Sequence, residues 1–229
     1  MSTRCEFPYA DNVCVIKEQG ILKRKFNLKY SYEGVTDISK LFIVATAMKV
    51  HVKVWDRSYI GFKMYGKSSC DVSLYCQKEG KEKLLVTPVY EKDYWSGDLT
   101  LEAYVPSALL ENLAVQVKYG DILSGEGVNV NDLYLFTRSG NVTCKSTFKK
   151  GFIKTLRGQL TIDINVKNNI ALEANTFIGD IDLTLKNVKK IIADEESQVK
   201  DFSNYHKFYS KGYTLKLLVK AIKGSITLN

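Results

Sequence analysis

A glycine that recurs with the same neighbours constrains this fold more than any other feature of the sequence. The aligned positions are Gly120, Gly140, Gly158, Gly179 and Gly224. The first four are separated by steps of 20, 18 and 21 residues, and the last step of 45 residues is close to two periods. A fixed period near 20 residues with strand-type alternation is typical of stacked β repeats.

The residues around these glycines also repeat. Two residues after each glycine stands an aliphatic side chain: Ile122, Val142, Leu160, Ile181 and Ile226. Five residues before it stand Val115, Leu135, Ile153, Ala174 and Val219, and three before it stand Val117, Thr137, Thr155, Thr176 and Ala221. Equivalent positions of successive repeats would stack at the inter-strand spacing of about 4.8 Å. We therefore predict ladders of like residues inside a β-solenoid.

The glycines themselves predict sharp corners, because a corner requires positive φ or a close backbone approach that a side chain hinders. A polar residue follows each one: Asp121, Asn141, Gln159, Asp180 and Ser225. We expect these side chains to bond corner backbone groups as Asx-type turns. Each glycine has a hydrophobic residue two positions later and none opens a helix, so a phosphate-binding loop is not indicated.

The first half of the chain predicts further strands without glycine corners. Val50, Val52 and Val54 alternate with His51, Lys53 and Trp55, which is the period-2 pattern of a half-buried strand. The other predicted strands span 25–32, 41–47, 60–66, 71–76, 84–90 and 99–106, with a further short strand at 13–18. Pro106 cannot donate to a ladder and marks a strand end.

We expect one domain over residues 1–229, divided by its sequence into five parts. These are an N-terminal edge or cap (1–24), irregular coils (25–112), glycine-corner repeats (113–183), an insertion (184–212) and a last coil (213–229). Within the insertion, residues 191–202 predict a short helix or a degenerate coil, and residues 204–212 an exposed loop rich in aromatic residues.

Composition excludes several functional classes. The net charge of +8 is spread over the chain, and no nucleic-acid-binding motif accompanies it, so no nucleic-acid partner is expected. Five cysteines without paired spacing and two histidines argue against a zinc site, and we predict no metal or cofactor. Cys144 occupies an inward position. The N-terminus does not read as a signal peptide and no transmembrane segment is indicated, so a cytoplasmic location is expected.

The motifs resemble a known family. Val105-Pro106, followed by Leu110, Leu113, Val115 and Gly120-Asp121-Ile122, and then by Gly140-Asn141-Val142 and Gly179-Asp180-Ile181, is similar to the bacterial putative adhesin family of unknown function. The resemblance covers residues 25–228. It implies a right-handed, single-stranded β-helix and association with the cell surface, and it carries over no catalytic residue.

The sequence therefore favours a non-catalytic, adhesin-like interaction or scaffold protein, with no catalytic residues. Its partner would be a protein or a glycan. The candidate contact residues are Tyr205, His206, Phe208, Tyr209 and Trp95. Two alternatives stay open: a carbohydrate-binding or carbohydrate-active β-helix, for which Asp180 and Asp182 are conceivable carboxylates, and a solenoid that assembles into homo-oligomers through its open ends.

Overall fold

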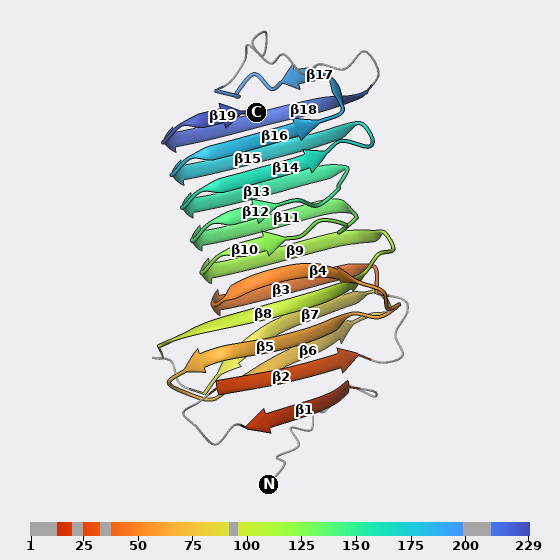
Figure 1. Cartoon of the computed structure of the whole chain (residues 1–229), viewed down its shortest axis with the longest axis vertical. Coiled ribbons are helices and arrows are strands. Elements are labelled where there is room, and N and C mark those ends of the chain that lie inside the picture. Colours follow the sequence, from red (N-terminus) through yellow and green to blue (C-terminus); the bar gives the residue numbers. More distant parts are fainter. Residues whose placement is uncertain (1–12, 20–24, 33–37, 92–95, 199–211) are drawn as a thin grey trace.

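The computed structural model describes residues 13–19, 25–32, 38–91, 96–198 and 212–229, the first two segments by their backbone alone. All regular structure in these residues is β, arranged in two mixed sheets that stack strand upon strand along one axis (Figure 1). Sheet A has ten strands and sheet B has nine.

In sheet A, strand order differs from chain order. Its strands, in spatial order, are β1 (Val13–Gln19), β2 (Lys25–Tyr32), β5 (Gly61–Ser68), β8 (Gly97–Pro106), β4 (Lys49–Trp55), β10 (Ile122–Ser124), β12 (Val142–Cys144), β14 (Leu160–Asn165), β16 (Ile181–Lys186) and β19 (Ile226–Leu228). From β1 to β8 the neighbours are antiparallel, and from β8 onward they are parallel.

Sheet B runs along the opposite side of the core. Its strands, in spatial order, are β17 (Val188–Ala193), β18 (Tyr213–Lys223), β15 (Ile170–Ile178), β13 (Lys150–Arg157), β11 (Val130–Ser139), β9 (Leu110–Tyr119), β3 (Lys40–Ala47), β7 (Lys83–Tyr90) and β6 (Val72–Glu79). Only the β6–β7 pair is antiparallel. A strand of sheet B followed by a strand of sheet A, joined at a corner, is called a rung below.

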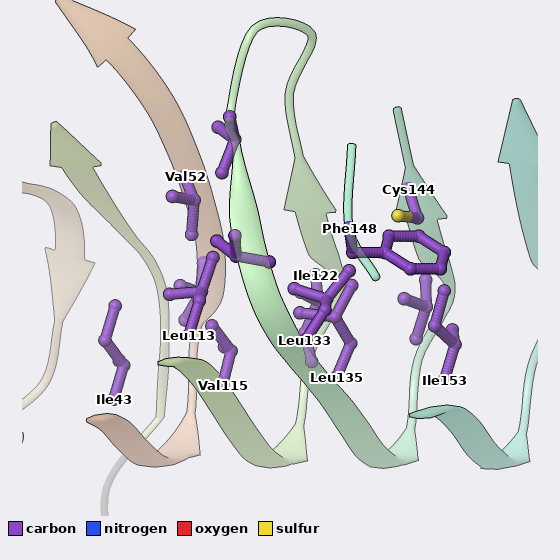
Figure 2. Packing of buried hydrophobic residues seen from close by; sticks show 14 of the residues in the cluster. Ile43, Val52, Leu113, Val115, Ile122, Leu133, Leu135, Cys144, Phe148 and Ile153 are labelled. Atoms are coloured by element: carbon purple, nitrogen blue, oxygen red, sulfur yellow. The ribbon is translucent and has the colours of Figure 1, made fainter. Parts of the chain in front are cut away.

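The predicted inward positions line one hydrophobic core between the sheets. Val115, Leu135 and Ile153 are fully buried and lie side by side on successive strands, as Figure 2 shows together with Ile122 and Cys144. The prediction that Cys144 points inward is confirmed, and burial raises the pKa of its thiol to about 12.

The glycine corners form a continuous column. Gly120, Gly140, Gly158, Gly179 and Gly224 all have φ between 138° and 159°. A Cβ on Gly140 would lie closer to the carbonyl oxygen of Gly120 than van der Waals contact permits, and each later glycine meets its predecessor in the same way. Both predicted reasons for glycine are confirmed, because the corner needs positive φ and leaves no room for a side chain.

The inward threonines bond the corners. The hydroxyl of Thr137 donates to the carbonyl oxygen of Gly120 at 2.9 Å, and that of Thr155 donates to Gly140 at 2.9 Å. Thr176 makes the same bond to Gly158 at 3.2 Å. Each buried hydroxyl therefore fixes the corner of the neighbouring rung.

The polar residues after the glycines bond in a way that the sequence prediction missed. Asp121 Oδ1 accepts a hydrogen bond from the backbone N–H of Asn141 (2.7 Å), and Asn141 Oδ1 accepts one from Gln159 (2.8 Å). Asp180 Oδ1 accepts from Ser225 (2.7 Å). An Asx turn would bond within its own corner, whereas these side chains bond the next rung.

Met48 continues the corner column without a glycine. Val50 pairs with Ile122 and Ala45 with Val117, so Met48 occupies the position beneath Gly120. This rung, β3 and β4, precedes β7 and β8 in the chain but lies between them and β9 and β10 in space.

The strand order at both ends of the stack of rungs therefore differs from the chain order. At the other end β17 follows β16 directly, yet β18 lies between β17 and β15. The long step from Gly179 to Gly224 thus spans no missing corner, since Gly224 stacks directly on Gly179. Residues 194–198 continue along β18, with Gln198 N–H donating to Val219 O, and the described part of the expected insertion has no helix.

Candidate binding groove on the outer face of sheet B

The five residues predicted from the sequence as partner contacts, Tyr205, His206, Phe208, Tyr209 and Trp95, all lie outside the described residues. Among the described residues, the candidate binding surfaces are the two outer faces of the rungs. On each strand, the outward residues alternate with the buried ones. Because the parallel strands are in register, outward residues of successive rungs line up in columns.

The most apolar of these columns on sheet B lies six residues before each corner. It consists of Phe42, Ala114, Tyr134, Phe152, Glu173 and Leu218. Tyr134 and Phe152 stack face to face, with ring centroids 5.1 Å apart and an interplanar angle of 3°. Tyr134 is nevertheless 38% exposed. The rings are therefore stacked along the axis of the rungs and accessible at the surface.

A groove of about 890 Å³ runs beside this column. Tyr134, Phe152 and Leu218 contribute apolar surface to it, and Ala171 leaves space because its side chain is small. Residues 192–196, the end of β17 and the segment after it along the edge of β18, also line it. The groove is thus formed by the regular outer face of sheet B and by the segment 192–196, which lies out of chain order beside β18.

Charged groups lie around the groove. Lys150 and Lys216 line it together with Asp132 and Glu173. Asn175 Nδ2 donates to Glu173 Oε1 at 2.6 Å, and Lys220 pairs with Glu196 beside it. Asp132 and Glu173 are separated by the whole of β13 and stand in different columns. Their separation exceeds two strand spacings, about 9.6 Å, which is wide for a pair of glycosidase carboxylates.

The outer face of sheet A is different in character. Three residues after each corner, its column reads His51, Leu123, Thr143, Thr161, Asp182 and Thr227. Asp182 accepts a hydrogen bond from Gln159, and Asp180 accepts two from Ser225 that hold its pKa below the usual range. Both carboxylates suggested by the sequence therefore serve the contacts between rungs.

His51, which the sequence places outside the core, is half-buried on this face. Burial lowers the pKa of its imidazole, and the positive charges of Lys53 and Lys49 lower it further.

A second cluster lies at the antiparallel end of sheet A. The carboxylate of Glu102, 6% exposed, accepts hydrogen bonds from Lys53 Nζ (2.5 Å), Tyr104 Oη (2.5 Å) and Tyr65 Oη (3.3 Å). Burial alone would raise the pKa of Glu102, but these donors outweigh it and the pKa is lowered. Because its oxygens are already engaged, this carboxylate stabilises the sheet rather than offering a vacant site.

Trp55 extends this cluster along β4. Its ring stacks on Tyr104 with centroids 5.3 Å apart and covers Gly61, where a Cβ would collide with the indole. These contacts assign Trp55 to packing within the sheet.

Among the described residues no group of three or more His, Cys, Asp or Glu side chains could hold a metal ion. Within the same ranges, no helix is long and apolar enough to cross a membrane.

The sequence-based prediction of contacts does not include Tyr134 and Phe152, although both lie within the aligned repeats. Both stand six residues before a corner glycine, a position one step out of phase with the buried residues. Comparing outward columns of the aligned repeats, and not only inward ones, shows aromatic residues at Tyr134 and Phe152 in successive repeats.

Comparison with known proteins supports the fold but not a function. No family model matches this chain, and no curated protein matches it. The crystal structure of a putative cell adhesion protein from Clostridium sporogenes superposes with a TM-score of 0.50 at 10% identity, over 94% of this chain and 99% of that one. At such identity the likeness is one of fold alone.

A putative adhesin from Bacteroides fragilis gives a TM-score of 0.36 at 11% identity, over 90% of this chain and 98% of that one. A further putative adhesin, from Parabacteroides distasonis, gives 0.38 at 11% identity, over 91% and 98%.

Proposed function

We propose that this chain is a single-stranded, right-handed β-solenoid that acts as a non-catalytic, adhesin-like binding protein. Its binding surface is the outer face of sheet B. The observation that carries the proposal is the groove of about 890 Å³ beside the exposed Tyr134–Phe152 stack. Binding sites are typically concave, with aromatic walls and a few polar groups that orient the partner.

The contrast between the two outer faces supports this choice. Exposed large hydrophobic residues gather on sheet B, among them Val44, Tyr134, Phe177, Ile192 and Ile222. The outward column of sheet A described above carries three threonines, an aspartate, a histidine and one leucine. Since an exposed apolar face costs free energy in water, its presence on one side only favours a partner that covers that side.

A matched pair of substitutions tests which face binds. Ala171 lies in the groove on β15, and Thr161 lies on the outer face of β14 in sheet A. An arginine at either position projects outward and leaves the core unchanged. The assay is saturable binding to envelope fractions of the cells that make or meet the protein. We expect Ala171→Arg to weaken this binding by about tenfold, or about 1.4 kcal/mol. Thr161→Arg should leave the binding unchanged.

Equal binding by both variants would contradict the choice of face, and the absence of any saturable binding would contradict a binding function. Circular dichroism of the two variants checks that each has kept its strands.

The non-catalytic part of the proposal has its own test. The purified chain is incubated with neutral and acidic polysaccharides, and new reducing ends are measured. We expect none above the rate without protein. Release that disappears in Asp132→Asn or Glu173→Gln, but persists in the Thr161→Arg control, would make the chain a carbohydrate-active enzyme.

A further inference from the structure

Next to the groove, the aromatic column of sheet B contains a gap one strand wide. Phe42 on β3 and Tyr134 on β11 are both in register with Ala114 on β9, which lies between them. Ala114 is half-buried and contributes only a methyl group. Two aromatic side chains therefore stand on either side of a small residue, at the same level of the sheet.

The orientation of the two rings makes this gap a slot. Tyr134 stacks on Phe152 on its far side, so its other face is directed toward Ala114. The ammonium of Lys83, from β7 on the far side of Phe42, lies over the Phe42 ring 4.6 Å from its centroid. The opposite face of Phe42 is therefore also directed toward Ala114.

The width of the slot follows from the sheet. Two strand separations place the rings about 9.6 Å apart, in keeping with the 5.1 Å measured across one separation between Tyr134 and Phe152. Two carbon contacts of about 3.5–4.0 Å occupy about 7–8 Å of that width. A flat ring would fit loosely, whereas a puckered ring with axial hydrogens fills the remaining space.

Polar groups flank the slot along β9. Asn112 and Gln116 stand two residues before and after Ala114 on the same outer face, and Gln116 is exposed. Each amide offers two donors and an acceptor. Asp132, exposed beside Asn112 on the adjacent strand, adds carboxylate acceptors. Apolar walls with amide and carboxylate groups at both ends match a ring that has C–H faces and hydroxyls at its rim.

We propose that Phe42, Ala114 and Tyr134 form a binding slot for one pyranose unit of a glycan. The C–H faces of the sugar pack against the two rings, the Ala114 methyl forms the floor, and Asn112, Gln116 and Asp132 bond hydroxyls. The inference rests on the proposed function, because it names a ligand class for the outer face of sheet B.

The test uses the whole chain with ¹³C-labelled alanine methyl groups. Methyl glycosides of β-glucose, β-galactose, α-mannose and β-N-acetylglucosamine are titrated separately, up to the solubility of each, and the Ala114 methyl signal is followed by NMR. We expect at least one sugar to shift this signal saturably. Saturation of the protein's aromatic protons should transfer to the C–H groups of that sugar.

Variants then assign the site. Phe42→Ala and Tyr134→Ala each remove a wall, and we expect each to weaken binding by about tenfold, the equivalent of about 1.4 kcal/mol for one aromatic contact. Ala114→Leu fills the slot and should abolish binding. Phe177→Ala, which removes an exposed ring elsewhere on the same face, is the control and should leave the affinity unchanged.

Three results would overturn the slot. No sugar shifts the signal, or Ala114→Leu binds as well as the unaltered chain, or adenosine binds in the slot and none of the four sugars does. In each case saturable binding to envelope fractions that is lost in Ala171→Arg would leave the proposed function standing.

Discussion

The first corner of the column, at Met48, and the glycine corners stacked on it make the same turn in different ways. At Gly140, a corner lies directly beneath, φ is 149° and no side chain fits. At Met48, φ is not positive and the side chain is buried. Beneath Met48 the Tyr90 hydroxyl bonds Ala47, and β7 and β8 are joined by a longer segment.

The difference shows what the glycine is for. A corner between a strand of sheet B and a strand of sheet A can be made by an ordinary residue, as at Met48. Glycine becomes necessary where rungs stack with their corners in contact. The repeats from Gly120 onward are thus stabilised by close backbone contact between rungs, whereas the N-terminal end depends on side chains, among them the Glu102 cluster.

The largest expected effect breaks a stacked corner. Gly140→Ala places a Cβ against the Gly120 carbonyl at a positive φ, and we expect it to cost more than about 3 kcal/mol of unfolding free energy, measured in urea. Gly80→Ala is the control, because Gly80 also has positive φ (66°) but nothing lies within 4 Å of a Cβ there. It should cost about 1 kcal/mol.

Met48→Leu completes that comparison and should cost less than about 1.5 kcal/mol, since it conserves volume in the core. If Gly140→Ala proves no worse than Gly80→Ala, contact between corners does not explain the glycine column.

The next effect concerns the N-terminal end alone. Glu102→Gln removes a charge that accepts three hydrogen bonds, and we expect it to cost about 2 kcal/mol near neutral pH. Because the folded pKa of Glu102 is lowered, its contribution is complete above the unfolded value of about 4.3 and is lost as the pH falls through the folded pKa. The two proteins should therefore converge in stability under acid conditions, and parallel pH curves would refute this role.

A smaller effect tests the bonding of the stacked corners. Thr155→Val keeps the shape of the side chain but removes the hydroxyl that bonds Gly140. We expect a loss of about 1–2 kcal/mol, because the buried corner loses the hydrogen bond to the Gly140 carbonyl oxygen. The loss should not vary with pH, unlike that of Glu102→Gln. Thr161→Val, at an exposed threonine of β14, should cost less than about 0.5 kcal/mol, and an equal loss would remove the special role of the inward threonines.

The sequence predicted the regular part of the molecule because each rung repeats the same physical problem. The glycines, the aliphatic ladders and the inward threonines appear at fixed offsets, so alignment of the chain with itself was sufficient. The rung of Met48 escaped this alignment because it has no glycine and is separated from Gly120 by four other strands. Strand insertion at both ends likewise leaves no local signal, since it depends on which edge a later segment pairs with.

The candidate site escapes sequence-based prediction for a related reason. The sequence favours the aromatic residues around Tyr205 as contacts, whereas Tyr134 and Phe152 lie in strands and read as part of the scaffold. Only the register between β11 and β13 shows that their rings stack, and only the tertiary path of residues 192–196 brings another segment to the groove beside them. Composition and periodicity contain neither fact.

The smallest effect concerns the exposed ladder beside the corners. Asn141 has two bonds in it: its backbone N–H donates to Asp121, and its side-chain oxygen accepts from the N–H of Gln159. Asn141→Ala removes only the second bond. Because water can replace an exposed acceptor, we expect a loss of about 0.5–1 kcal/mol, with faster hydrogen exchange at the Gln159 amide. The amide of residue 141 keeps its hydrogen-bond partner and is the internal control. Equal acceleration of hydrogen exchange at both amides would mean that the corners open together. In that case the ladder would not stabilise the corners one rung at a time.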